Sequence, residues 1–542
     1  MYITLRIALL LVFSFAALAQ EKGEFVVPEN RANPGSRKIT IRYHRFPSTS
    51  AKPGHPIVYL AGGPGGSGIG ASMGSRRVLV EALREFGDVI AYDQRGTNES
   101  GPKMTCSQQY AYPPNEPLDR AKAGPVMAAA MRPCVDKLRA DGVDIAAYNT
   151  RENAADLEDL RNHLGAQKLI LWGISYGTHL SIAALRENAA HIDRVILAGI
   201  EGPDDTFKLP SDQQSLMEEI ARMAPGDLLA SARNVLRELE RSPKKVTVTH
   251  PLNGMSVELV MGPLDFQVEV ADRLFAPENY ANLPDFITRI EKGDWTALAL
   301  ATGETRFGPV PSVMSVAMDC ASGITTARKT VIANEAKRTL LGDAINLPFP
   351  EICGAVNVPD LGDAFRAPLR SDVPALLISG TLDGRTRPRQ ADELRATMPN
   401  AQHLVIEGAG HSDPLWLSSP KILEAMKNFL RGERVTERVI TLPRMQFLPV
   451  RTVANVSDAV LARYVGTYRV DDKNVRRVIK AGPVLWTVRE GNPPFAIRPM
   501  SPTEFFYENG GATVRFEVDA QGKATAMVFR TATGEEQRGV RE

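Results

Sequence analysis

The chain has 542 residues and a formal net charge of +1, with 43% hydrophobic and 23% charged residues. This composition is typical of a soluble globular protein, and the length exceeds that of one ordinary domain. The balanced charge argues against nucleic acid or an acidic surface as the main partner.

The first nineteen residues have the pattern of a secretory signal peptide. Arg6 ends a short basic segment, residues 7–16 are apolar, and Ala17-Leu18-Ala19 is an A-x-A cleavage site. An uncleaved membrane anchor is the alternative, but the apolar stretch is short for a bilayer. No apolar run of about 18 residues follows, so we expect a secreted or periplasmic protein without membrane contact once the signal is removed.

The chain contains four cysteines, and an oxidising compartment would keep them as disulfides. Four cysteines allow three pairings, and the sequence does not choose among them. We prefer nearest-neighbour pairing, because each bond would then close one polar, loop-rich insertion. A metal site is the alternative, but no C-x-x-C motif or nearby histidine cluster supports it. The preferred pairs are Cys106 with Cys134 and Cys320 with Cys353.

The first elements after the signal are predicted to be strands at the edge of a sheet. Residues 25–28 and 39–44 are separated by turn residues at 33–36, which indicates an antiparallel pair. A buried strand at 56–60 then runs into a glycine-rich loop at 61–68. A phosphate loop is the rival interpretation, but the lysine and Ser/Thr that close a nucleotide P-loop are missing.

The next segment is predicted to hold a helix at 78–86 and a strand at 88–92. Charged residues at 93–100 follow the strand, and we expect them to form a buried hydrogen-bond network rather than to act in catalysis. Residues 101–148 form a polar, proline-containing excursion with two of the cysteines. A helix at 152–164 leads onward.

The stretch from Lys168 to Leu185 carries the strongest motif of the chain. An apolar strand at 169–172 runs into G-I-S-Y-G at 173–177, and helical spacing follows. A G-x-S-x-G turn between a buried strand and a helix is the nucleophile elbow of α/β-hydrolases, which makes Ser175 the candidate nucleophile. A second G-x-S-x-G surrounds Ser72 but lacks such a strand, so we interpret Ser72 as a loop residue.

Two further candidates follow later buried strands. The strand at 373–380 leads into Asp383, and the strand at 403–406 leads into His411. The chain order Ser175, Asp383, His411 is the hydrolase order of nucleophile, acid and base. Each residue lies beyond the carboxyl end of a strand, where open α/β sheets have their sites.

Two neighbouring residues are less suitable for catalysis. His179 lies on the helix after Ser175, and we expect it to pack or to form hydrogen bonds. Asp413 is two positions from His411, and a side chain so close in sequence rarely orients the same imidazole. Asp383 therefore remains the candidate acid.

The oxyanion hole is expected to come from two backbone N–H groups. In α/β-hydrolases the residue after the nucleophile supplies one and a loop after an early strand supplies the other. We assign the first to Tyr176 and the second to Gly63, or failing that to Gly62. A glycine loop of purely structural use is the alternative.

About 170 residues of helical character separate the strand at 194–200 from the strand at 373–380. A loop of that length inside a compact domain is uncommon, so we predict a mainly α-helical cap inserted over the site. From about residue 440, short alternating strands predict a small antiparallel β domain without catalytic or metal-ligand groupings. The expected units are a signal peptide (1–19), an α/β core (20–204 and 371–435), the cap (205–370) and the C-terminal β domain (436–542).

Five motifs are specific when taken together. They are G-G-P-G-G-S-G at 62–68, D-Q-R-G-T at 93–97, G-I-S-Y-G at 173–177, L-D-G-R-T at 382–386 and G-A-G-H-S at 408–412. With them the chain resembles the prolyl iminopeptidase and tripeptidyl aminopeptidase branch of the α/β-hydrolases, over about residues 25–432. Ala61 stands where prolyl iminopeptidases usually have histidine, and Asn98 stands where a glycine is usual. The first departure favours the secreted type that releases several residues.

The resemblance implies a serine exopeptidase that removes residues from the free N-terminus of peptides, with no cofactor and no metal. In that branch the cap recognises the terminal amine, so a carboxylate should lie near Ser175. We nominate Glu201, which directly follows a sheet strand. Glu218 and Glu219 in the cap are rivals, and a turn-capping role for Glu201 is the alternative.

Two other functions are alternatives. A secreted carboxylesterase acting on small esters would use the same triad and oxyanion hole. A binding protein on a hydrolase scaffold is a third interpretation, and the intact Ser175, Asp383 and His411 argue against it. Haloalkane dehalogenase and epoxide hydrolase chemistry needs an aspartate at the elbow, where this chain has serine.

Overall fold

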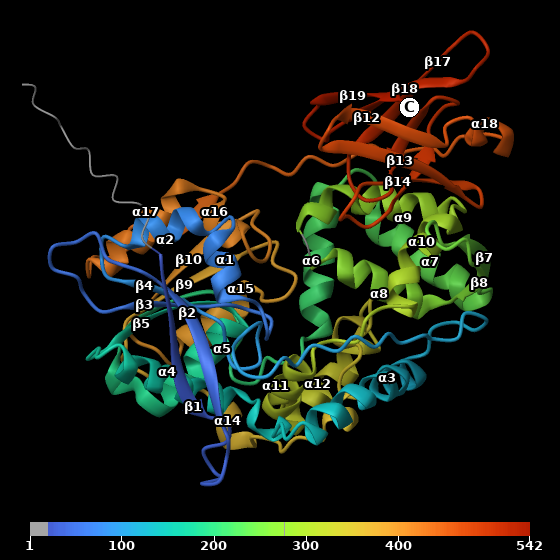
Figure 1. The fold of residues 1–542 in the computed structure, drawn as a ribbon. Coiled ribbons are helices and arrows are strands. Elements are labelled where there is room, and N and C mark those ends of the chain that lie inside the picture. Colours follow the sequence, from blue (N-terminus) through green and yellow to red (C-terminus); the bar gives the residue numbers. More distant parts are fainter. Residues whose placement is uncertain (1–19, 276) are drawn as a thin grey trace, which may run out of the picture.

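The computed structural model describes residues 20–275 and 277–542, so the predicted signal peptide at 1–19 lies outside the described residues. A nine-stranded sheet runs through one half of the molecule (Figure 1), in the order β1-β2-β4-β3-β5-β6-β9-β10-β11. β2 is antiparallel to both of its neighbours, and the strands from β4 to β11 are mutually parallel. The mostly parallel sheet predicted from the sequence is confirmed. Its strands are β1 Glu21–Pro28, β2 Lys38–Phe46, β3 Ile57–Leu60, β4 Val89–Tyr92, β5 Leu169–Ser175, β6 Ile192–Ile200, β9 Ala375–Gly380, β10 Ala401–Glu407 and β11 Val439–Thr441.

Both faces of the central strands are buried, because alternate side chains of a strand point to opposite faces. In β3, Val58 and Leu60 enter one apolar core, while Ile57 and Tyr59 enter the other. Helices α4 (Thr150–His163), α5 (Tyr176–Asn188) and α15 (Pro388–Arg395) cover the first face. Helices α2 (Arg77–Leu83), α16 (Pro414–Leu417) and α17 (Pro420–Leu430) cover the second. None of the helices within residues 20–275 and 277–542 is long and apolar enough to cross a membrane.

The segment predicted as a polar excursion contains α3 (Arg120–Ala140), a helix of 21 residues. The sequence pattern does not predict this helix, because Pro125 and Pro133 lie inside it and proline removes a hydrogen bond from a helix interior. The helix nevertheless buries an apolar stripe that includes Met127 and Val135. Burial of this stripe compensates for the lost hydrogen bonds.

Residues 205–370 are mostly helical, as predicted, but they also contain an antiparallel hairpin that the sequence analysis did not predict. The hairpin consists of β7 (Lys244–Thr249) and β8 (Ser256–Met261). The helices are α6 Pro210–Met223, α7 Leu228–Arg241, α8 Pro263–Arg273, α9 Leu283–Glu291, α10 Trp295–Arg306, α11 Val313–Ser322, α12 Thr326–Ala336, α13 Cys353–Val356 and α14 Asp363–Arg366.

The excursion packs against this helical region rather than standing apart from it. The fully buried guanidinium of Arg306 donates hydrogen bonds to Asp265 at 2.7 and 2.9 Å and to the carbonyls of Pro113 and Glu116 at 3.0 and 2.9 Å. In Figure 1 α3 runs beside α11 and α12, and it contacts α11 and α13. Disulfides join Cys106 to Cys134 and Cys320 to Cys353, which is the nearest-neighbour pairing.

The C-terminal residues form a closed barrel in which each strand is antiparallel to its neighbours, at the far side of the helical region (Figure 1). The antiparallel β domain predicted from the sequence is confirmed, although its first and last strands were missed. A short helix, α18 (Asp458–Ala462), precedes it. The strands are β12 Gly466–Asp471, β13 Asn474–Ala481, β14 Val484–Val488, β15 Phe495–Pro499, β16 Glu504–Tyr507, β17 Thr513–Val518, β18 Ala524–Arg530 and β19 Glu536–Arg541.

A buried ionic network joins the barrel to α9. Arg289 on α9 pairs with Glu508 of the barrel at 2.6 Å and with Asp294 at 2.6 Å. Arg498 on β15 pairs with the same two carboxylates at 3.0 Å each. Each of these four charges therefore has a partner of opposite sign.

Candidate active site

Ser175 stands at the turn between β5 and α5, with φ 55° and ψ −126°. The turn requires glycine on both sides of the serine. A Cβ added to Gly177 would lie 2.1 Å from the carbonyl oxygen of Leu60, and one added to Gly173 would lie 2.6 Å from the carbonyl oxygen of Gly177. The strand–turn–helix context that defines a nucleophile elbow is therefore present around Ser175.

The glycine-rich loop after β3 lies directly against this turn. A Cβ added to Gly62 would lie 2.9 Å from the Cβ and 3.5 Å from the Oγ of Ser175. Gly63 has φ +126°, and a Cβ there would lie 2.7 Å from the backbone nitrogen of Gly65. The start of the loop is also fixed by a hydrogen bond, which the Gln94 side chain donates to the Ala61 carbonyl at 2.9 Å. Only glycine allows the backbone to come this close to the serine.

Asp383 and His411 meet at the carboxyl ends of β9 and β10. The Nδ1 atom of His411 lies 2.8 Å from the Oδ2 atom of Asp383. The Oδ1 atom accepts hydrogen bonds from the backbone N–H groups of Arg385 and Thr386, at 2.8 Å each, and the Thr386 hydroxyl donates to Oδ2 at 2.8 Å. Burial acts to raise the pKa of Asp383, but its interaction with His411 and the backbone hydrogen bonds outweigh burial, so the pKa is lowered.

Ser175 and His411 lie at the same edge of the sheet. Ser175 pairs with Ile200 in the register of β5 and β6. A Cβ added to the adjacent Gly199 would lie 3.1 Å from the Cε1 atom of His411. Among the described residues no hydrogen bond joins the Ser175 hydroxyl to His411. Such contacts are often long in the absence of substrate and shorten when it binds.

Asp413 does not contact His411 through a hydrogen bond but fixes the chain that follows it. Its carboxylate pairs with Arg76 at 2.8 Å and accepts from the Ser75 hydroxyl at 2.5 Å. Arg76 also donates to the Ser412 hydroxyl at 3.0 Å and to the buried Tyr59 hydroxyl on β3. Arg76 therefore links the histidine loop to the strand that leads into the glycine-rich loop.

His179 and Ser72, which the sequence analysis set aside, both form internal hydrogen bonds. His179 is buried and bonds the Gly202 carbonyl at 3.0 Å, and burial lowers its pKa. The Ser72 hydroxyl donates to the Ile69 carbonyl at 2.7 Å. Ser72 lies in a short helix, α1 (Gly68–Met73), so its assignment to a loop was wrong. The Asp93 and Ser67 side chains hold the start of this helix, with 2.8 Å between them.

Glu201 is buried next to the serine turn and is already ion-paired. Its backbone N–H donates to the Thr178 hydroxyl at 2.8 Å, and that hydroxyl donates to the Ser175 carbonyl at 2.7 Å. Its carboxylate lies 2.7 Å from the Nζ atom of Lys208. Glu219, one of its rivals, pairs with Arg387 at 2.9 Å instead.

Asp319 on α11 is a second carboxylate near Glu201, and the sequence analysis missed it. It keeps some contact with solvent but is surrounded by protein on most sides. Burial, and then the negative charge of Glu201, raise its pKa well above the ordinary value. No motif marks Asp319 in the sequence, so only the folded chain reveals it.

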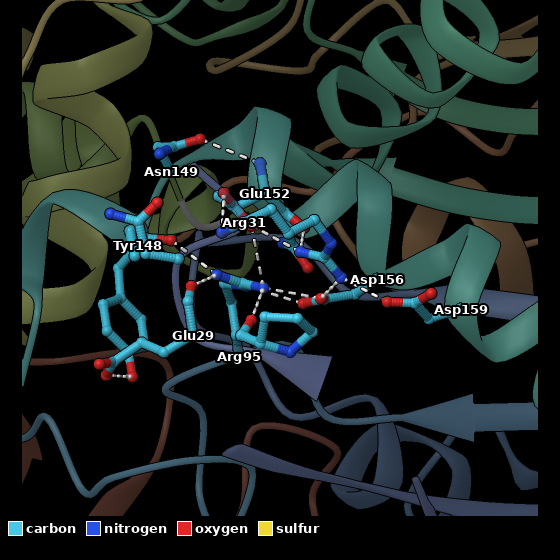
Figure 2. Close-up of polar contacts among 12 residues, drawn as sticks. Glu29, Arg31, Arg95, Tyr148, Asn149, Glu152, Asp156 and Asp159 are labelled. Atoms are coloured by element: carbon cyan, nitrogen blue, oxygen red, sulfur yellow. Dashed lines mark hydrogen bonds and ion pairs between the residues drawn. The ribbon is translucent and has the colours of Figure 1, made fainter. Parts of the chain in front are cut away.

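The charges of D-Q-R-G-T build a buried network, as predicted. Figure 2 shows Arg95 between the residues before α4 and the helix itself. Its guanidinium donates twice to Asp156, at 2.7 Å each, and to the carbonyls of Glu29 and Ala147 at 2.7 and 2.8 Å. Arg31 reaches Asp156 from the other side at 2.7 Å. The network thus holds together the β1 end, α4 and the loop after β4.

Loss of the Asp156 carboxylate will destabilise the protein strongly. Asp156→Ala removes the carboxylate that pairs with the fully buried Arg95. Removing one partner of a buried ion pair lowers the free energy of unfolding by about 3–5 kcal/mol. Asp159→Ala is the matched control, because Asp159 pairs with Arg31 at the surface and such pairs are worth about 0–1 kcal/mol. Urea denaturation measures both, and equal losses would contradict the structural role of Asp156.

A family model described as the alpha/beta hydrolase fold matches residues 55–416. The chain belongs to the α/β-hydrolase fold family. The matched stretch of this α/β-hydrolase includes Ser175, Asp383 and His411. The fold expected from the five motifs is therefore confirmed.

Relatives of this α/β-hydrolase include peptidases. It is 30% identical over 197 residues to serine protease Hip1 of Mycobacterium tuberculosis, covering 34% of this chain and 36% of that protein. It is 27% identical over 195 residues to tripeptidyl aminopeptidase of Streptomyces coelicolor, covering 33% and 35%. Each match spans only about a third of the relative's length. Among solved structures, proline iminopeptidase of Mycobacterium smegmatis is similar with a TM-score of 0.36 and 14% identity, over 76% of this chain and 98% of that chain.

Proposed function

We propose that this α/β-hydrolase is a secreted or periplasmic serine exopeptidase that hydrolyses peptide bonds near the free N-terminus of peptides, like prolyl or tripeptidyl aminopeptidases. The observation that carries the proposal is the 2.8 Å contact between His411 and the buried Asp383, at the sheet edge where the Ser175 turn stands. Similarity to a tripeptidyl aminopeptidase supports a peptide substrate. The two disulfides support an oxidising compartment.

In the proposed mechanism, Ser175 attacks the scissile carbonyl while His411 accepts its proton. The Nδ1 atom of His411 faces a carboxylate, so it carries the proton and leaves Nε2 free to act as the base. The N–H groups of Tyr176 and Gly63, or Gly62 in its place, bind the oxyanion of the tetrahedral intermediate. His411 then protonates the leaving amine, and water releases the acyl-enzyme with His411 again as base.

The terminal ammonium of the peptide is proposed to bind at Glu201, with Asp319 beside it. The Thr178 hydroxyl bridges the backbones of Glu201 and Ser175 by hydrogen bonds. Glu201 therefore lies close to the place where Ser175 would attack the scissile bond. Lys208 neutralises part of its charge, so a single carboxylate would bind an ammonium weakly. A bound cation would favour the ionised form of Asp319, whose pKa is raised in the free protein.

A matched panel of chromogenic substrates tests this function. The panel contains Pro, Ala and tripeptide anilides with free amines, the same anilides with blocked amines, and a short-chain ester. We expect turnover of free-amine anilides only, and the anilide cleaved fastest will give the number of residues released. Turnover of the ester without any anilide would replace the proposal by the alternative, a carboxylesterase.

A further inference from the structure

The interior of the C-terminal barrel is apolar along most of its length. Val478, Leu485, Ile497 and Phe516 belong to one buried cluster there. Side chains two positions away along a strand face the same side, so the interior-facing residues at one end can be named. These residues, beside the turns at 472–473, 489–494, 508–512 and 531–535, form what we call the barrel mouth: Asn474, Arg476, Thr487, Phe495, Tyr507 and Phe529.

The barrel mouth contains a buried cation without an anionic partner. The Arg476 side chain is 7% exposed, and its guanidinium lies 4.0 Å from the ring centre of Phe529. In the part of the chain that the structure describes, Arg476 forms no ion pair, its Nε atom has no hydrogen-bond partner, and its polar neighbour is the neutral Tyr507 hydroxyl. Burial lowers the pKa of Arg476, and the nearby Arg489 acts in the same direction. Arginine nevertheless stays protonated in proteins, so the charge remains.

Arg476 is an exception among the buried arginines of the described residues. The others all pair with a carboxylate within 3.2 Å, and they are Arg76, Arg95, Arg273, Arg289, Arg306, Arg366, Arg387 and Arg498. A buried charge without an anionic partner is costly, because a neutral hydroxyl and an aromatic ring replace only part of its lost hydration. A ligand that brings an anion would remove this cost.

The side chains around Arg476 indicate what kind of anion fits. Phe495 is 42% exposed at the open end, and its ring centre lies 6.5 Å from that of Tyr507. The Tyr507 ring packs against Phe529 at 5.7 Å. The buried Oδ1 atom of Asn474 also lacks a hydrogen-bond partner among the described residues. The mouth therefore combines one cation with an apolar, aromatic rim.

We propose that the barrel mouth binds an amphipathic carboxylic acid, with its carboxylate on Arg476 and its apolar body against Phe495. The guanidinium presents several N–H donors in a planar fork, a geometry that matches a carboxylate. Such a carboxylate can come from a fatty acid or from the C-terminus of an apolar peptide. The site is separate from Ser175, because it lies in the barrel beyond α9 (Figure 1).

Calorimetric titration of the full-length Ser175→Ala variant tests the site without interference from hydrolysis. The probes are decanoate with decanol as its neutral counterpart, and the amine-blocked peptide N-acetyl-Ala-Ala-Phe with its C-terminal amide. We expect at least one acid to bind about tenfold or more tightly than its neutral counterpart, since a charge-assisted hydrogen bond is lost in the latter. The acid that binds identifies the source of the carboxylate.

Variants of neighbouring residues locate the binding. Arg476→Gln in the same background should weaken binding of that acid by about tenfold or more, and Phe495→Ala should weaken it without affecting folding, because its ring is half exposed. Arg477→Gln is the matched control, since Arg477 is the next residue on β13 and points outward to solvent. The proposal is overturned if neither acid binds, or if binding is the same in Arg476→Gln as in Arg477→Gln. Neither result depends on the proposed peptidase activity.

Discussion

Replacement of Ser175 by alanine will lower the turnover of a free-amine anilide by about 10⁶-fold, as loss of the nucleophile does in other serine hydrolases. The change removes one small hydroxyl at a half-buried position and leaves both flanking glycines, so the fold should be unaffected. Steady-state kinetics with the best anilide of the panel measures the loss. A serine-directed phosphonate should label the wild-type protein and fail to label the variant.

Ser72→Ala is the internal control for this experiment, because Ser72 lies in the second G-x-S-x-G of the chain. Its hydroxyl is bonded to the Ile69 carbonyl within α1, so its removal costs at most about 1 kcal/mol of stability and leaves turnover near the wild-type value. A comparable loss of turnover in both variants would mean that Ser175 is not the nucleophile.

The relation between strands and candidate residues could be predicted from the sequence. Ser175, Asp383 and His411 each follow a short apolar run, and parallel strands bring their carboxyl ends to one edge of a sheet. The structure has Asp383 and His411 in contact there, although 28 positions separate them in the chain. This part of the site depends only on local patterns and on a known sheet geometry.

Features that depend on distant contacts could not be predicted. Helix α3 forms although it contains two prolines, which disfavour a helix interior. The burial that stabilises it against the rest of the chain cannot be read from the sequence. Strands β12 and β19 each bury only one residue fully and carry charged residues, so neither shows a clear apolar alternation. Closure of the barrel pairs them with each other. The partner of Glu201 was equally hidden, because Lys208 reaches it only after the chain turns back.

Replacement of Asp383 by asparagine will lower turnover by about 10⁴-fold, the loss found when the acid of a serine hydrolase triad is changed in this way. The carboxylate accepts the Nδ1 proton of His411, whereas an asparagine amide can donate to that nitrogen and stabilise the wrong tautomer. Asp413→Asn is the control: Asp413 is partly exposed and bonded to Arg76, and such pairs are worth about 0–1 kcal/mol, so the loss should stay below about tenfold. Equal losses would contradict the assignment of Asp383 as the acid of the triad.

The same variant also tests the lowered pKa of Asp383 through stability. A carboxyl group with a lowered pKa in the folded state stabilises the fold fully above its unfolded pKa of about 3.9, and this contribution is lost as the pH falls through the lower folded value. Asp383→Asn has no such contribution at any pH. The difference in free energy of unfolding between wild type and variant should therefore be constant near neutral pH and shrink below about pH 4. A difference that stays constant or grows in acid, measured by chemical denaturation, would show that the pKa of Asp383 is not lowered.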